Sequence, residues 1–575
     1  MPGNSFLVPL DVSQHKISVT PEQFAKLPLD QRARILSGLQ PSMKLRYMAV
    51  CEDMGDLVKA MEPQDVYLAV KEIGIGDAGD IITSMTTDQF RTCLDLDSWS
   101  RDELIVDSTI RWFTAMSDTP LEVLAEMIGE LDYEFLAALF SGMFKVYISR
   151  EDFDPDEGEP PDSFTPDGVY YLQFTCSEHE RELLKKIMLT LCSERQESYA
   201  RILSFVRDGM PITQSEEAYR WRTNRLSDLG FPEYNEALKL YSRPDKKKEA
   251  KAHSRTAGEP VPAFAIVRHD GHPALPSTIL EGLSELEMAA VASSAAYLIN
   301  KLLVADRSDP GDMENLVETM DKARGMISIG LDVLGGDPVK TICSVPLAEI
   351  FRTGYGRLLD LQERAQKLLD QHPLISGDRR AIRLEDHLRD TLAAILQPRP
   401  KFHVDKGDSA PDGNMDFRNV ADVMAVTEVL DMIDASAEIF GRIFKIFKKD
   451  IAVMDIKGLN VISRDEINAC RIANTAIARK ILSGSYSFEP LPLSQIGEFY
   501  SKVFSTSGGL TVFSDAVKDV SASIAGEISA ARPELNHAVK KVVDGCLKQV
   551  MEEMAGVDPS AGFDPDLISS LLIRK

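Results

Sequence analysis

Long apolar runs and aromatic side chains are both scarce in this 575-residue sequence, in which aromatics make up 7% of the residues. The longest weakly polar run spans residues 288–299 and contains serines, whereas a membrane-spanning helix needs roughly 20 apolar residues. The N-terminus lacks the basic segment and the apolar core of a secretory signal peptide. We therefore expect no transmembrane segment and a cytoplasmic location.

Cysteine is scattered along the chain. The seven cysteines include no CxxC pair, and their odd number argues against a disulfide framework. Most of them lie within apolar helical patterns. We therefore expect them to be reduced core residues of a cytoplasmic protein: Cys51, Cys93, Cys176, Cys192, Cys343, Cys470 and Cys546.

Positive charge is in deficit. The chain has 64 lysines and arginines against 90 aspartates and glutamates, which gives a formal net charge of −26. Such a chain repels nucleic-acid phosphates and anionic lipid headgroups. We therefore expect no nucleic-acid partner, and the charge is most simply a source of solubility.

Signatures of familiar enzymes are also missing: no nucleophile elbow, P-loop, zinc-protease or kinase motif occurs. Residues Gly74–Gly79 match GxGxxG, but a dinucleotide-binding turn needs a strand before it. Val66, Val70 and Ile73 precede this stretch at helical spacing. The pattern therefore predicts a loop between two helices.

Two stretches contain residue types that bind metals. His269 and His272 lie close together, but no third ligand follows at a recognised spacing. The segment Asp152–Asp156 begins like a calcium loop, yet Glu157 and Ser163 occupy the positions that need glycine and glutamate. The sequence assigns no catalytic residue and no cofactor-binding residue, and a metal site is left unknown.

A helical repeat is the strongest positive feature. Residues 57–70 and 81–94 each contain an apolar helix end, a short polar turn and a new amphipathic helix, and further copies are expected at Leu27–Leu36 and Leu124–Phe140. Such a unit cannot bury its own apolar face, so it must stack on its neighbours. The aligned pairs are Met61 with Met85, Val66 with Phe90, Ala69 with Cys93 and Val70 with Leu94.

The repeats between residues 27 and 99, and above all Met61-Glu-Pro-Gln-Asp-Val66 and Met85-Thr-Thr-Asp-Gln-Phe90, resemble the N-terminal domain of MgtE-type magnesium transporters. The resemblance implies a right-handed α-superhelix of short helix pairs, and magnesium sensing by acidic residues that face a CBS domain. No CBS-like βαβ pattern and no membrane domain is evident here. As a whole, the chain resembles an uncharacterised bacterial family of cytosolic, acidic, helical proteins.

The predicted fold class is all-α, with an N-terminal α-superhelix of short helix-turn-helix repeats followed by one or two helical-bundle domains. Val169–Phe174 is the best strand candidate. Ser284 and Glu287 form a capping box that opens a helix running to about Ala305. Breaks in composition divide the chain into an MgtE-like repeat domain (1–150), an acidic Pro-rich linker (151–168), a helical region with a possible short strand (169–242), a basic Pro- and Gly-rich linker (243–276), a helical domain (277–397), a polar loop (398–418) and a C-terminal helical domain (419–575).

Within the last region, a basic and aromatic stretch at residues 440–449 has helical spacing. It could dock on a membrane surface or on an acidic partner. We favour a simpler interpretation, in which the apolar side chains face the core and the lysines are solvated. Those apolar side chains are Phe440, Ile443, Phe444 and Phe447.

Three functions are compatible with these patterns. The leading hypothesis is a non-enzymatic cytoplasmic scaffold or regulatory adaptor whose N-terminal repeats bind a protein partner. The second is a soluble magnesium sensor in which carboxylates of adjacent repeats share a hydrated ion, although helix capping explains the same residues: Asp53, Asp56, Asp77, Asp80, Asp95 and Asp97. The third is an enzyme of unrecognised class with a pocket between helical domains, involving His269, His272 or His403.

Overall fold

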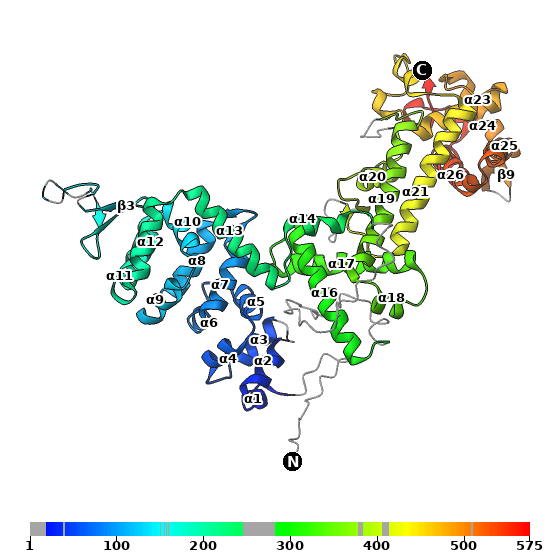
Figure 1. Cartoon of the computed structure of the whole chain (residues 1–575). Coiled ribbons are helices and arrows are strands. Elements are labelled where there is room, and N and C mark those ends of the chain that lie inside the picture. Colours follow the sequence, from blue (N-terminus) through cyan, green and yellow to red (C-terminus); the bar gives the residue numbers. More distant parts are fainter. Residues whose placement is uncertain are drawn as a thin grey trace. The chain divides into compact units, whose positions relative to one another are not determined.

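A computed structural model shows a predominantly helical protein (Figure 1). It forms two compact units: unit 1 runs to Ile327 and includes Gly335–Phe351, and unit 2 comprises Ser328–Leu334 and Arg352–Lys575. None of the described helices is long and apolar enough to cross a membrane. The structure describes residues 19–244, 282–377, 383–404 and 413–575, except positions 38, 40, 150, 155, 157, 159, 161, 508 and 509.

Short helices fill the first part of unit 1, as the repeat predicts. Helices α5 (Pro63–Ile73) and α7 (Thr87–Asp97) begin at residues 63 and 87 and end at 73 and 97, so both bounds differ by 24. The eight residues aligned in the two copies are all buried, none more than 5% exposed. The remaining elements of this part are α1 (Pro21–Phe24), α2 (Leu29–Ser37), α3 (Pro41–Met48), α4 (Met54–Ala60), α6 (Gly79–Ile82), β1 (Trp99–Ser100), β2 (Glu103–Leu104), α8 (Val106–Met116), α9 (Leu121–Gly129) and α10 (Tyr133–Ser141).

Alternate helices of this part pack on one another. Helix α3 contacts α5, and α5 contacts α7; in the same way α4 contacts α2 and α6, and α6 contacts α8. A helix and its second neighbour therefore share an interface, and in this way short helices bury faces that no single pair could bury. The right-handed superhelix itself stays a prediction.

The predicted strand at Val169–Phe174 is β5 (Tyr170–Phe174). Its antiparallel partner is β3 (Phe144–Ile148), with Phe144 opposite Phe174, and β4 (Ser163–Phe164) pairs with its other edge. The aromatic rings of Phe144 and Phe174 meet edge to face, with centroids 5.8 Å apart. The next helices are α11 (Glu178–Glu194), α12 (Gln196–Asp208), α13 (Pro211–Asp228), α14 (Tyr234–Ala237) and η1 (Leu238–Tyr241).

The capping box at Ser284 is confirmed. Its backbone amide donates to Glu287 Oε2 at 3.0 Å, and the Glu287 amide donates to Ser284 Oγ at 3.4 Å. Helix α16 then runs from Glu285 to Asp306, close to the predicted end at Ala305. It is followed by α17 (Met313–Leu334), α18 (Pro338–Ser344), which the sequence did not predict, and α19 (Leu347–Gln371).

Unit 2 contains more than the helices that the sequence predicts. The antiparallel pair of β9 (Phe504–Ser507) with β10 (Leu510–Phe513) and the parallel pair of β8 (Leu491–Pro492) with β11 (Ile573–Arg574) lie within a region predicted as helix. The other elements are α20 (Asp386–Ile395), β6 (Phe402–His403), β7 (Asn414–Met415), α21 (Val420–Glu438), η2 (Ile439–Phe444), α22 (Lys448–Ala452), η3 (Arg464–Glu466), α23 (Ala469–Ser483), η4 (Leu493–Gln495), α24 (Ile496–Val503), α25 (Asp515–Ala531), η5 (Pro533–Leu535), α26 (Asn536–Met554), η6 (Pro559–Ala561) and η7 (Pro565–Leu567).

The basic and aromatic stretch at residues 440–449 does not form one continuous helix. The prediction that Phe447 faces the core was wrong. Phe440 and Phe444 are buried as predicted, but Phe447 is 40% exposed. The cause is local: the chain leaves the π-helical segment η2 at Lys445, whose φ of 54° is left-handed. A side chain beyond that turn no longer follows the helical spacing, so Phe447 precedes α22 and does not reach the core.

Candidate functional site

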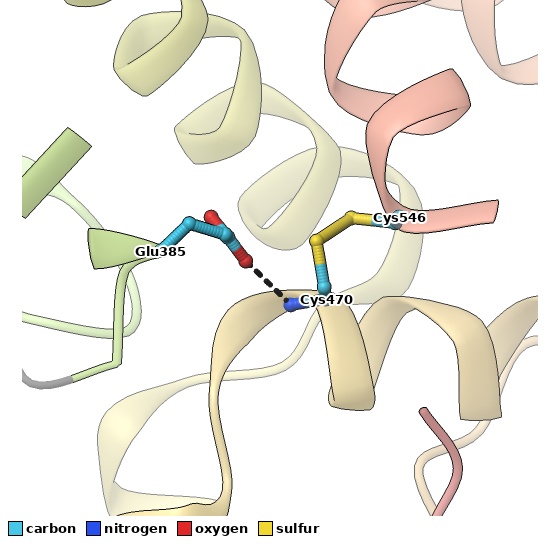
Figure 2. A group of neighbouring side chains, drawn as sticks. All are labelled: Glu385, Cys470 and Cys546. Atoms are coloured by element: carbon cyan, nitrogen blue, oxygen red, sulfur yellow. Dashed lines mark hydrogen bonds between the residues drawn. A yellow bond between two sulfur atoms is a disulfide. The ribbon is translucent and has the colours of Figure 1, made fainter. Parts of the chain in front are cut away.

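Cys470 and Cys546 form a disulfide between helices α23 and α26 (Figure 2). Their Cα atoms are 4.7 Å apart, although 76 positions separate them in the sequence. Both side chains are buried. The expectation that every cysteine is reduced was therefore wrong for these two. The other cysteines are free: Cys51, Cys93, Cys176, Cys192 and Cys343.

Glu385 lies beside this disulfide. It precedes α20, and its Oε1 accepts the backbone amide of Cys470 at 2.9 Å (Figure 2). Burial raises the pKa of the Glu385 carboxyl, although the hydrogen bonds from backbone amides act in the opposite direction. The carboxyl is therefore easier to protonate than an exposed glutamate, next to two sulfur atoms.

Residues 383–385 and the N-cap residue Asn468 together cap the start of helix α23. The amide of Ala469 donates to the carbonyl of Arg383 at 2.6 Å, and the amide of Arg471 donates to Asn468 Oδ1 at 2.8 Å. With the bond from Cys470 to Glu385, three of the first amides of α23 have partners outside the helix. Helix N-termini leave such amides without intrahelical acceptors, so this contact fixes the position of Cys470.

One ligand atom from each of Glu385, Cys470 and Cys546 can lie within 4.8 Å of the other two. Among the described residues, these three side chains form the one group of at least three that could hold a metal ion. A cysteine binds zinc as its thiolate, and here the two sulfurs are bonded to each other. In the oxidised state the cluster is therefore a disulfide site with an adjacent carboxyl, and only its reduced state could bind a metal through sulfur.

A groove lies on the other side of α26, between this helix and α25. Its cavity is about 550 Å³. Val517 and Ala525 of α25 and Val543 and Leu547 of α26 line it, and all four are buried. The floor of the groove is therefore apolar, and the two helices that form it contact each other.

Lysines surround this floor. Lys518, Lys540 and Lys548 line the groove together with a single acidic residue, Asp544. Lys518 pairs with Asp515 at 2.9 Å and Lys548 with Glu552 at 3.6 Å, but all four side chains are more than 60% exposed. Exposed pairs of this kind contribute little energy, so a ligand can take over these lysines at small cost.

Unit 1 contains a different polar cluster, centred on Asp97. Its carboxylate accepts hydrogen bonds from Lys71 Nζ at 2.6 Å, Trp112 Nε1 at 2.8 Å and Ser108 Oγ at 2.9 Å. Burial acts to raise the pKa of Asp97, but these hydrogen bonds and the charge of Lys71 hold it below its usual range. Asp97 is therefore an internal structural anion with its acceptor positions filled.

Some of the carboxylates considered for magnesium already pair with cationic side chains of the protein. Arg32 donates two hydrogen bonds to Asp53, and Arg225 donates to both oxygens of Asp95 at 2.7 and 2.9 Å. With Asp97, three of the six are thus neutralised by protein cations. The remaining three, Asp56, Asp77 and Asp80, lie within or beside the short helices α4 and α6.

Those of the other predicted positions that the structure describes are not brought together into a site. Gly74 is the C-cap of α5 and Gly79 begins α6, so a helix and not a strand precedes the glycine turn. Asp152 accepts the amide of Ile148 at 2.6 Å in its own loop. His403 lies in β6. His269 and His272 lie outside the described residues.

Sequence reasoning missed both the disulfide and the groove. Cys470 and Cys546 are too far apart in the sequence to be paired by spacing. A signal for the groove was present, because positions 540, 543, 544, 547, 548 and 551 recur at helical spacing on α26 and all line it. A second apolar face, which includes Val539, Cys546 and Val550, is buried on the same helix.

The geometry defines a predominantly helical protein with a series of short packed helices in unit 1, and with a groove and a disulfide site in unit 2. The chain belongs to a family of unknown function, DUF6178, whose match covers residues 21–574. Comparison with curated proteins and with solved structures gave no match. The resemblance to MgtE-type transporters stays a prediction.

Proposed function

We propose that this protein is a binding protein that holds an acidic amphipathic helix of a protein partner in the groove between α25 and α26. The observation that carries the proposal is the combination of an apolar floor with three lysines at its edge, in a chain whose net charge is −26. Three lysines against one carboxylate among the lining residues is an unexpected ratio in so acidic a protein, and it complements an anionic ligand.

The shape of the groove favours a helical peptide. Amphipathic helices place apolar side chains at positions i, i+3, i+4 and i+7 into a groove between two helices. Lysines beside the floor then pair with glutamates that flank the apolar stripe, and such pairs set orientation and specificity. A cavity of about 550 Å³ accommodates a few such side chains and not a whole partner domain.

The net charge restricts the partner further. Long polyanions such as nucleic acids meet repulsion from the chain as a whole. A short peptide with a few glutamates experiences mainly the local lysines, because charges beyond about 10 Å are screened at 0.1 M salt. The proposal thus retains the role of a scaffold or regulatory adaptor and moves its partner site from the N-terminal repeats to unit 2.

Magnesium sensing receives less support. Asp53, Asp95 and Asp97 already pair with Arg32, Arg225 and Lys71. A hydrated magnesium ion would have to displace these cations from their carboxylates, two of which are buried. A thermal-shift titration with MgCl₂, matched for ionic strength, tests this alternative directly.

A labelled peptide tests the proposal. We use the full chain and an 18-residue helical peptide with a leucine stripe flanked by glutamates, and measure binding by fluorescence anisotropy. A dissociation constant in the micromolar range, on the order of −8 kcal/mol, is expected for a small groove. The same peptide with lysines in place of the glutamates should bind at least about tenfold more weakly, which is roughly 1.4 kcal/mol.

Matched variants locate the site. Ala522, exposed and lining the groove, is changed to tryptophan to fill it, and exposed Ser523, which does not line the groove, is changed to tryptophan as the control. The account expects A522W to abolish binding and S523W to retain it. Equal binding by both variants, or equal affinity for the acidic and basic peptides, rejects this groove as the site.

A further inference from the structure

The disulfide and the groove share a helix. Cys546 lies on α26, between the groove residues Asp544 and Leu547, and its sulfur is bonded to Cys470 near the start of α23. Asn474 of α23 also donates from Nδ2 to the carbonyl of Cys546 at 2.8 Å. One wall of the groove is thus attached covalently and by a hydrogen bond to a neighbouring helix.

We propose that Cys470 and Cys546 form a reversible thiol–disulfide site whose redox state sets how firmly α26 forms its side of the groove. The reductant is a dithiol. The regulatory part of this inference rests on the proposed peptide-binding function, whereas the thiol chemistry of the site stands independently of it.

The chemistry of the site favours Cys470 as the leaving group. It is the second residue of α23, and the positive end of a helix stabilises a thiolate. A thiolate of the dithiol attacks Cys546 Sγ, the S–S bond breaks, and Cys470 leaves and takes up a proton. The second thiol of the reductant then attacks the mixed disulfide and releases Cys546. Two electrons and two protons pass to the protein, and the reductant becomes a cyclic disulfide.

Burial makes this exchange slow and dependent on local opening. Cys470 is 4% and Cys546 2% exposed, so a dithiol reaches them only when α26 moves away from α23. A ligand in the groove contacts α26 and makes that opening rarer. By linkage, a ligand that disfavours reduction must itself bind the oxidised protein more tightly, and by the same factor.

The direction of the coupling follows from preorganisation. In the oxidised protein, α26 is already held in the position that forms the groove, so less conformational freedom is lost when a ligand binds. We expect about a fivefold tighter binding of the acidic peptide to the oxidised than to the reduced chain, the lower end of typical coupling factors.

The first measurement counts thiols in the full chain. The protein is equilibrated in buffers of reduced and oxidised dithiothreitol, and the exchange is then quenched. The chain is unfolded and alkylated, and the number of alkylated cysteines is determined by mass spectrometry. We expect a single two-electron transition from five alkylated cysteines to seven, because five of the seven are free in the oxidised chain. Seven alkylated cysteines in every oxidising buffer overturn the proposal, as does a pair that no dithiol reduces until the protein unfolds.

The second measurement separates the disulfide from a metal site. Reduced protein is incubated with ZnCl₂ alone and dialysed, and bound zinc is measured. One tightly held zinc per chain that protects both thiols from every oxidant overturns the redox site and assigns Glu385, Cys470 and Cys546 to a metal. Reoxidation in the presence of zinc supports the proposal.

Hydrogen exchange of α26 tests the coupling without a ligand. Amides of residues 536–554 should exchange more slowly in the oxidised chain than in the reduced chain, and the C470S/C546S variant should match the reduced chain. C343S, which removes an exposed free cysteine, is the control and should behave like wild type. Equal exchange in both states ends the regulatory inference. The peptide could bind neither redox state while the cysteine pair is still reduced and reoxidised and still alters hydrogen exchange of α26. That result rejects the proposed peptide-binding function and leaves the redox site intact.

Discussion

Charged side chains serve different purposes in the two units. In unit 1, Asp97 is surrounded by donors, and its side chain is only 6% exposed. In unit 2, the lysines that line the groove are exposed. Lys518 and Lys548 pair with acidic side chains, and these are exposed as well. Charges that are already satisfied inside a fold specify its structure, whereas exposed charges beside an apolar floor are available to a ligand. We therefore expect Asp97 to act on stability, and we propose that the exposed lysines beside the groove between α25 and α26 act on binding.

The largest effect is expected at Asp97. Its replacement by alanine leaves Trp112 Nε1 without its acceptor and leaves Lys71 with only the more exposed Asp309, at 3.4 Å. Breaking a buried ion pair costs about 4 kcal/mol. Urea unfolding of D97A should show this loss. The matched control is D88A, because the Asp88 side chain is 83% exposed in its pair with Arg91; a comparable loss in both variants contradicts the distinction between internal and exposed charges.

Removal of the disulfide should be the next largest effect. The bond closes a sequence separation of 76 residues, and disulfides of this kind contribute about 3 kcal/mol. The C470S/C546S variant should lose this amount in denaturant unfolding under oxidising conditions, with C343S unchanged. Under reducing conditions the difference from wild type should largely disappear. A variant as stable as oxidised wild type shows that the bond does not constrain unit 2.

A third effect concerns pH. His372 is fully buried, and burial lowers the pKa of its imidazole from 6.5 to about 4. Its Nδ1 accepts the amide of Leu374 at 3.1 Å, so the neutral ring is the form that fits. A lowered folded-state pKa means that the unfolded chain binds the proton more tightly. Stability is therefore lost as pH falls from about 6.5 towards 4.

The expected loss attributable to His372 between pH 7 and pH 5 is about 2 kcal/mol. We compare wild type with H372N, whose side-chain oxygen can take the place of Nδ1, by urea unfolding at both pH values. The variant is less stable at pH 7 but should show a flatter pH dependence. Parallel pH profiles of the two proteins mean that His372 does not titrate as described.

The smallest expected effect on stability is at the groove. Lys540 is exposed, and K540E should change the free energy of unfolding by less than about 0.5 kcal/mol. Its effect on peptide affinity should be larger, about tenfold or roughly 1.4 kcal/mol, because a glutamate repels the acidic peptide. Lys457, exposed in unit 2 and away from the groove lining, provides the control K457E. Equal peptide affinity in the two variants removes the lysines from the binding account.

The sequence predicted local features well. Helical spacing placed Met61, Phe90 and Cys93 in the core, and the pairing of Ser284 with Glu287 located the start of α16. These features depend on residues within one or two helical turns of each other. The end of the helix at Lys445 was not predictable in this way, because spacing alone does not reveal a left-handed residue.

The candidate sites depend on contacts that are distant in the sequence. Cys470 meets Cys546, and Glu385 meets Cys470, only because α20, α23 and α26 pack in unit 2. The groove likewise needs two helices, although its lining positions on α26 recur at helical spacing in the sequence. Ion pairs such as that of Arg225 with Asp95 could not be predicted for the same reason. The sequence therefore did not reveal that some of the carboxylates considered for magnesium pair with cationic side chains.

Hydrogen exchange of the full chain with and without the acidic peptide tests the central claim most directly. The account predicts that the peptide slows exchange in α25 and α26, residues 515–531 and 536–554, and leaves the N-terminal helices between residues 21 and 141 unchanged. Protection of those N-terminal helices with none in α25 and α26 would contradict it, and would return the partner site to the repeats.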